Sequence, residues 1–341
     1  MIHLSALKVA INCFPLMEEL AGPEQPPKKI PFNNLYLLSG LVHGMNKTWM
    51  YVFTILFVMF GYLSFQLLIL YPLMARLRER GFSDMEIINN PALVFDSVAL
   101  GMDRNVLLLM ELGMFVFAFM GFYIGIRRLH HKTLTSVLTG YSRFRSNRFW
   151  FAFLVWGGLI IAATVVSYFA DPGEFRISFQ PGGFFLSLII LFILMPIQTG
   201  IEELLFRGYF MQGLSLIFRN GIVPLILTST LFGLAHMNNP EVREYGWMLM
   251  LPYYCGTALF MGLLTLLDEG LELAFGLHFA NNFVSALLVT SPHSVLKAYS
   301  IFEARSENPA AEILLWLVLA VISFVIFWMR YRWKNFNLII K

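Results

Sequence analysis

The sequence predicts an all-α protein, a polytopic membrane helical bundle with about eight transmembrane helices. Of its 341 residues, 58% are hydrophobic and only 13% are charged, whereas a soluble domain has about 45–50% apolar and about 25% charged residues. The apolar residues gather in runs of the length that crosses a bilayer as a helix, about 20 residues. Runs such as FAFLVWGGLIIAATVVSYFA are apolar all round, whereas membrane β-barrel strands alternate apolar and polar residues.

Eight segments qualify as spans by this measure, and polar or proline-containing loops separate most of them. They are Trp49–Tyr71, Val106–Ile126, Phe149–Ala170, Gly183–Phe206, Ile222–Met237, Trp247–Leu267, Leu271–Thr290 and Ala311–Met329.

The composition also excludes several classes of protein. So apolar a chain is not a soluble enzyme, a nucleic-acid-binding protein or a disordered protein. Cys13 and Cys255 are the only cysteines, which excludes a disulfide scaffold. The formal net charge of +3 is too small to indicate a partner.

The chain divides into four parts. Residues 1–48 are expected to form a cytoplasmic or interfacial tail, because VAINCFPLM is too short to span and no cleavage site follows it; a short surface helix is expected there. Residues 49–182 hold the first transmembrane helices and their loops. Residues 183–290 form a core that carries most of the polar residues within spans, and residues 291–341 hold the last span and a basic tail. The loop Arg76–Arg104 is expected to carry a surface helix at DSVALGMDRNV.

The distribution of Lys and Arg predicts the orientation of the helices. With a cytoplasmic N-terminus, 16 of the 24 basic residues lie in cytoplasmic segments, with Arg76, Arg78 and Arg80 as the main exceptions. Since cytoplasmic loops carry the excess of Lys and Arg, we expect both termini in the cytoplasm.

Ionisable residues inside spans mark functional sites, because the bilayer makes them costly. The fourth span carries Glu202, Glu203 and Arg207. Glu203 and Arg207 are four residues apart on one helix face and can pair. Glu202 is rotated by about 100° and stays free to react. A charge cluster at the membrane edge is the alternative interpretation.

Two further spans carry polar residues at helical spacing. Phe232 and His236 are four residues apart in the fifth span, and His278 and Asn282 in the seventh, with Asn281 between them. Taken singly, His236 suits a helix cap, and the seventh-span residues suit hydrogen bonds between helices. Taken together, the three spans suggest one shared site. It would lie in one plane only if the fourth helix is long or tilted.

These residues match three motifs in order: EELLFR fits E-E-x-x-x-R, FGLAH fits F-x-x-x-H and HFANN fits H-x-x-x-N. In this the chain resembles the CAAX-protease and bacteriocin-processing family of intramembrane endopeptidases, which includes the Ras-converting CAAX endopeptidase. The resemblance covers about a third of the chain, from Phe184 to Thr290.

The resemblance implies a role for each residue. Glu202 would activate a water molecule, and His236 would help to hold it. His278 and Asn282 would polarise the scissile carbonyl and stabilise the oxyanion. Glu203 and Arg207 would be the supporting ion pair. The substrate would be a membrane-anchored peptide or protein, which is lipidated for some family members, and the location would be a bacterial inner membrane.

A metal-free site is expected, because the H-E-x-x-H motif of zinc proteases is absent. The alternative is zinc held by Glu202, His236 and His278. Two other functions stay open. The chain could be a non-proteolytic partner of another membrane protein, or a proton-coupled transporter, because Glu, His and Arg clusters also relay protons. No nucleic-acid partner is expected.

Overall fold

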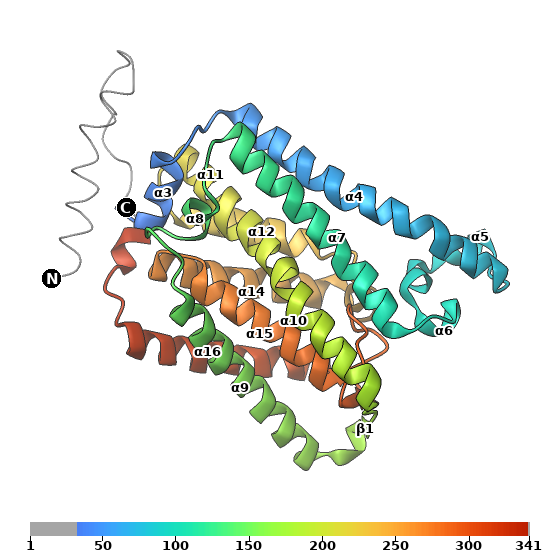
Figure 1. Cartoon of the computed structure of the whole chain (residues 1–341). Helices are drawn as coiled ribbons and strands as arrows, with labels where there is room; N and C mark the ends of the chain where they lie inside the picture. Colours follow the sequence, from blue (N-terminus) through green and yellow to red (C-terminus); the bar gives the residue numbers. More distant parts are fainter. Residues whose placement is uncertain (1–32, 340–341) are drawn as a thin grey trace. The chain divides into compact units, whose positions relative to one another are not determined.

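Helices make up most of the structure, a computed structural model that describes residues 33–339 (Figure 1). Among these residues, six helices are long and apolar enough to cross a membrane, which confirms the predicted fold class. They are α4 (Thr48–Glu79), α7 (Arg104–Ile124) continued by η2 (Gly125–Leu129), α9 (Ser146–Ala170), α10 (Pro181–Glu203) continued by η4 (Leu204–Phe210) and α11 (Met211–Phe218), α14 (Trp247–Asp268) and α16 (Pro309–Tyr331).

Two of the eight predicted spans are short helices in the part of the chain that the structure describes. Helix α12 (Ile222–Ala235) has 14 residues, and α15 (Glu272–Leu288) has 17. At 1.5 Å per residue, α12 covers about 21 Å of a hydrocarbon core about 30 Å thick. Helix α12 ends at His236, shortly before α13 (Pro240–Tyr245), which begins at a proline.

Helix α4 is longer than predicted, because Pro72 lies inside it without ending it. The loop that follows contains α5 (Asp84–Asn89), η1 (Pro91–Phe95) and α6 (Ser97–Leu100). A surface helix was predicted here. Only the four residues of α6 form it, since Gly101 ends the helix in a left-handed conformation with φ of 59°.

Part of the predicted tail is packed into the helical unit. Helix α3 (Leu35–Val42) buries Tyr36 and Leu37, and it lies against α11 and α8 (Leu134–Leu138). The Tyr36 hydroxyl lies 2.8 Å from the carbonyl oxygen of Val137 and 2.9 Å from that of Arg207. The surface helix predicted at VAINCFPLM lies outside the described residues.

Three short strands form one small sheet among the described residues. The strands β1 (Phe175–Ile177), β2 (Val289–Thr290) and β3 (Phe302–Ala304) form a sheet in the order β1-β3-β2. Strand β3 is antiparallel to β1 and parallel to β2. The short helices η3 (Pro172–Glu174) and η5 (Phe336–Ile339) complete the described chain.

Glycines let two helix pairs approach closely, as is common in membranes. Helix α9 packs along α15, and α4 runs beside α7 (Figure 1). A Cβ on Gly276 of α15 would lie 2.1 Å from the Phe149 carbonyl oxygen of α9. A Cβ on Gly121 of α7 would lie 2.2 Å from the Phe57 carbonyl oxygen of α4. Both contacts therefore require glycine.

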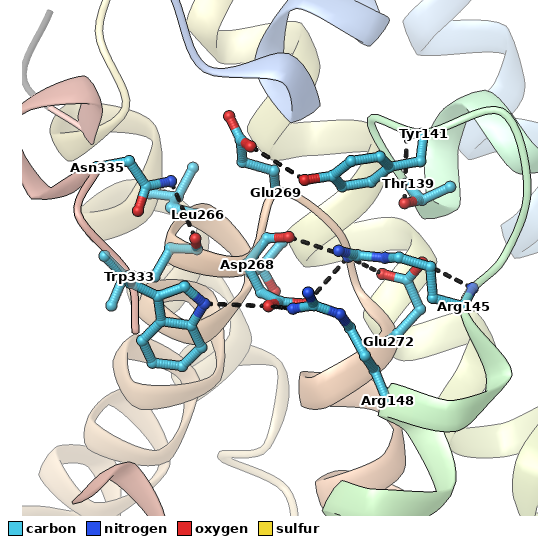
Figure 2. A network of polar contacts seen from close by, with 12 residues as sticks. Thr139, Tyr141, Arg145, Arg148, Leu266, Asp268, Glu269, Glu272, Trp333 and Asn335 are labelled. Atoms are coloured by element: carbon cyan, nitrogen blue, oxygen red, sulfur yellow. Dashed lines mark hydrogen bonds and ion pairs between the residues drawn. The ribbon is translucent and has the colours of Figure 1, made fainter. Parts of the chain in front are cut away.

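A buried ionic network joins the start of α15 to α9 and to the chain that follows α16 (Figure 2). Arg145 Nη2 lies 3.0 Å from Asp268 Oδ2 and 2.6 Å from Glu272 Oε2. Arg148 also pairs with Asp268, and the Trp333 indole donates to the same carboxylate at 3.1 Å. The Asp268 and Glu272 side chains are fully buried. The network thus fixes the start of the helix that carries His278.

Candidate active site

Glu203 and Arg207 form the ion pair that their spacing predicts. Arg207 Nη1 lies 2.9 Å from Glu203 Oε1, and the two side chains are 0% and 1% exposed. Both lie in the continuous helix Pro181–Phe218, which has 38 residues. Residues 204–210 are wound as a π-helix, a feature frequent at functional sites. The fourth helix is therefore long. The sequence analysis required this if the polar residues of the three spans were to lie in one plane.

Glu202 takes no part in that ion pair, and it has a neighbour that the sequence analysis missed. Gln198, one turn earlier, donates its Nε2–H to Glu202 Oε1 at 2.6 Å. Glu202 Oε2 is buried without a hydrogen-bond partner and lies 3.6 Å from His278 Nε2. One carboxylate oxygen is thus held while the other is left for a further donor.

His278 bridges the two carboxylates. Its Nδ1 lies 2.7 Å from Glu203 Oε1. A carboxylate only accepts hydrogen bonds, so Nδ1 carries a hydrogen and donates a hydrogen bond to Glu203. Its Nε2 faces Glu202 and lies 3.4 Å from Asn282 Nδ2. Glu203 therefore fixes the orientation of the imidazole, as carboxylates do for ligating and catalytic histidines.

The two asparagines of α15 are tied into the same network. Asn282 donates through Nδ2 to Gln198 Oε1 at 3.3 Å and accepts through Oδ1 from Asn281 Nδ2 at 3.1 Å. Asn281 Oδ1 accepts from the Trp156 indole of α9 at 3.1 Å. Asn281 thus links Asn282 to Trp156, and Asn282 in turn contacts Gln198 and His278.

His236 joins the site from the end of α12. Its Nδ1 lies 2.7 Å from the Phe232 carbonyl oxygen, which leaves Nε2 for another partner. Its ring stacks on Phe232 with centroids 4.2 Å apart and lies 4.9 Å from the ring of Tyr254. The other motif residue, Phe232, also lies under the Arg207 guanidinium at 4.1 Å. The F-x-x-x-H motif thus connects the ion pair to the second histidine.

A cavity of about 940 Å³ contains the polar ends of these residues. Glu202, His236, His278 and Asn282 all line it, together with Gln198. The structure therefore brings residues of three separate helices into one cavity that is large enough to hold water.

Glu111 is a second lining residue that the sequence analysis missed. It is a carboxylate within the predicted span Val106–Ile126, so the cost of a charge inside a span was the available signal. Gln198 was identifiable as the polar residue four positions before Glu202, on the same helix face.

The site does not have the arrangement of a zinc centre. Among the residues that the structure describes, no three His, Cys, Asp or Glu side chains lie close enough together to hold a metal ion. The alternative ligand set of Glu202, His236 and His278 shares the cavity without converging on one point.

The fold and this site define an integral membrane protein of packed helices with a carboxylate–imidazole centre inside the bundle. Residues 181–284 match the family model described as type II CAAX prenyl endopeptidase Rce1-like, a family of proteases. The match contains all three motifs and confirms the family resemblance for this part of the chain.

One relative covers most of the chain. The uncharacterised protein YyaK of Bacillus subtilis (strain 168) is 26% identical over 274 residues, which are 80% of this chain and 88% of the relative. No solved structure matches the chain.

Proposed function

We propose that this protein is an intramembrane endopeptidase that hydrolyses a peptide bond of a membrane-associated protein or peptide, held there by a lipid or an apolar segment. The observation that carries the proposal is Glu202 Oε2, which is buried in a cavity without a hydrogen-bond partner, 3.6 Å from His278 Nε2. A carboxylate oxygen of this kind accepts a proton from a water molecule that enters the cavity.

In the proposed reaction, Glu202 removes a proton from water while Gln198 holds its other oxygen. His236 holds that water through Nε2, the nitrogen that its backbone contact leaves free. The hydroxide attacks the scissile carbonyl carbon, and the peptide nitrogen leaves with the proton that Glu202 returns. Glu202 is therefore regenerated in each turnover.

His278 and Asn282 stabilise the charge that develops on the carbonyl oxygen. Asn282 Nδ2 donates to the oxyanion, and His278 donates as well when both of its ring nitrogens are protonated. Glu203 holds that ring through Nδ1, and Arg207 balances the charge of Glu203. Preorganised donors of this kind stabilise a tetrahedral intermediate more than the ground state.

The proposed setting is a bacterial plasma membrane with both termini in the cytoplasm. The Lys and Arg distribution supports this orientation, and the relative in Bacillus subtilis supports the setting. The substrate enters from the membrane, and the reaction needs no metal.

The test is reconstitution in lipid with quenched fluorescent peptides that carry a lipid anchor. Glu202→Gln should lower kcat by about 10²–10⁴-fold with an unchanged melting temperature, because it removes the base and little volume. His278→Ala should also lose activity. Thr230→Val, on the exposed face of α12, should remain active. Full activity in Glu202→Gln would contradict the proposed mechanism.

The same samples separate the alternatives. A chelator should leave cleavage unchanged, whereas a loss that zinc restores would overturn the metal-free mechanism. Proton flux without cleavage would indicate a transporter. Binding of another membrane protein that survives Glu202→Gln, again without cleavage, would indicate a non-proteolytic partner.

A further inference from the structure

The two ends of the helical unit differ in charge. We define the basic end as the start of α4, the segments 127–148, 219–221 and 268–272, and the chain from 330 onward. Contacts join these segments, as in the Arg145 and Trp333 bonds to Asp268. We define the acidic end as residues 76–104, 171–180, 236–247 and 289–312. Its segments also contact one another, as between Tyr299 and Asp103 and between His293 and Glu244.

Among the described residues, the basic end has eleven Lys and Arg, and the acidic end has eight. Those of the basic end are Lys47, Arg127, Arg128, Lys132, Arg143, Arg145, Arg148, Arg219, Arg330, Arg332 and Lys334, against the acidic residues Asp268, Glu269 and Glu272. Those of the acidic end are Arg76, Arg78, Arg80, Arg104, Arg176, Arg243, Lys297 and Arg305, against Glu79, Asp84, Glu86, Asp96, Asp103, Asp171, Glu174, Glu241, Glu244, Glu303, Glu307 and Glu312. The excess of Lys and Arg places the basic end in the cytoplasm.

The catalytic cavity reaches the acidic end. Beyond the catalytic residues its lining includes Asn238, Asn239 and Glu241 before α14, and Ser294 and Leu296 after α15. All of these belong to acidic-end segments. No described residue of the basic-end segments lines it.

A buried ionic network lies between the site and the basic end. His278 lies six residues, or about 9 Å, from the start of α15 at Glu272. At that start the network of Figure 2 fills the space with the buried carboxylates of Asp268 and Glu272 and the guanidinium groups of Arg145 and Arg148. A peptide that entered from this end would have to break these ion pairs, which is costly for buried charges.

We infer that the active site opens to the non-cytoplasmic face of the membrane, so that its substrates are peptide segments on the exported side. The inference rests on the proposed endopeptidase function for its substrate class. The side to which the cavity opens is inferred only from the cavity lining, the ionic network at the basic end and the charge difference between the two ends. The cleaved segment is then part of a translocated peptide, or the outer juxtamembrane part of a membrane protein.

The first test measures the sidedness of the cavity without any substrate. In a background of Cys13→Ser and Cys255→Ala, single cysteines replace Ser285 or Ser294, which line the cavity, or Ser142, which is exposed at the basic end. A membrane-impermeant maleimide should label the first two variants in intact cells and the third only in inverted vesicles. The reverse pattern would overturn the inference.

The second test measures cleavage from each side. The anchored quenched peptide is added to spheroplasts and to inverted vesicles that contain the wild type or Glu202→Gln. We expect cleavage by wild-type spheroplasts alone. Cleavage by inverted vesicles alone would overturn the inference and keep the endopeptidase function. Without cleavage on either side, the exported-substrate class is rejected together with the proposed function, while the labelling pattern still decides the sidedness of the cavity.

Discussion

At the scale of single residues, Glu203 supports both the fold and the site. Its Oε1 lies 2.9 Å from Arg207 Nη1 and 2.7 Å from His278 Nδ1, and the side chain is fully buried. Glu203→Gln should therefore lower the melting temperature as well as kcat, because Arg207 keeps a buried charge without its partner. Breaking such a pair costs about 3–5 kcal/mol. Thermal unfolding in detergent and peptide cleavage measure the two effects.

A double variant separates these two effects. Glu203→Gln with Arg207→Met removes both charges, so stability should return toward that of the wild type. Cleavage should stay low, because a neutral amide orients the His278 ring less firmly than a carboxylate does. The amide also stabilises the protonated form of the ring less. Recovery of full activity in the double variant would show that Glu203 acts only through stability.

Gln198 is expected to hold the catalytic base. It donates to Glu202 at 2.6 Å and lies 3.3 Å from Asn282 through its other atom. Gln198→Leu removes one hydrogen bond to a charged group, worth about 1.5–3 kcal/mol, so kcat should fall about 10–100-fold. KM should change little. An unaltered kcat in a stable Gln198→Leu protein would refute this role, and Thr230→Val again serves as the control.

At the scale of elements, the network of Figure 2 should hold three segments together through Asp268. Its carboxylate contacts Arg145, Arg148 and Trp333 and is buried. Asp268→Asn leaves two guanidinium groups short of a partner, and we expect a loss of about 3–5 kcal/mol in stability. The midpoint of thermal unfolding reports this loss.

Asp84→Asn is the matched control for that prediction. Asp84 pairs with Arg78 at 2.6 Å, but the side chains are 48% and 62% exposed for Arg78 and Asp84. Exposed ion pairs contribute about 0–1 kcal/mol, so this variant should melt as the wild type does. Equal melting of both variants would show that the buried network does not stabilise the fold.

Lys132 should make stability depend on pH. It follows η2, is 2% exposed, and donates to the Gly40 carbonyl oxygen at 3.0 Å and to Asn46 Oδ1 at 2.8 Å. Burial lowers the pKa of its amine from 10.5 to about 8. Between these values the unfolded chain binds the proton and the folded chain does not, so the free energy of unfolding rises with pH.

The measurement is the melting temperature in detergent across that pH window. The wild type should gain stability as the pH rises from 8 toward 10.5, and Lys132→Met should lack this gain. A gain of the same size in the variant would assign it to other groups.

At the scale of the whole molecule, apolar length and composition were enough to predict a helical membrane protein. They were not enough for the ends of helices. Pro72 was expected near a helix end and lies inside α4, because neighbouring packing sustains the helix. Helix α12 stops two residues before its predicted end at Met237, with His236 at its C-cap and two asparagines before Pro240.

The site was partly predictable for the same reason. Spacing alone predicted the Glu203–Arg207 pair, since both residues lie on one helix. The contact between His278 and Glu203 joins residues 75 positions apart in the sequence, and no local pattern encodes it. Glu111 was missed although its charge inside a span was visible.

One side of helix α4 lines the cavity, and another side is exposed. Met59 and Leu63 line the cavity, whereas Phe60 and Leu67 do not line it and are 74% and 65% exposed. Gly61 between them lies against α7, where a Cβ would be 2.3 Å from the Phe117 carbonyl oxygen. This part of the cavity wall is thus held in place by close contact between the backbones of α4 and α7.

Under the proposed function, a fixed wall of this kind would let the enzyme select its substrates by length. The anchor of a substrate would remain outside α4, while the bond to be cleaved would lie in the cavity on the other side. The number of residues between anchor and bond would then have to match the path around this helix. Substrates would be sorted by this spacer length as well as by the side chains at the cleavage position.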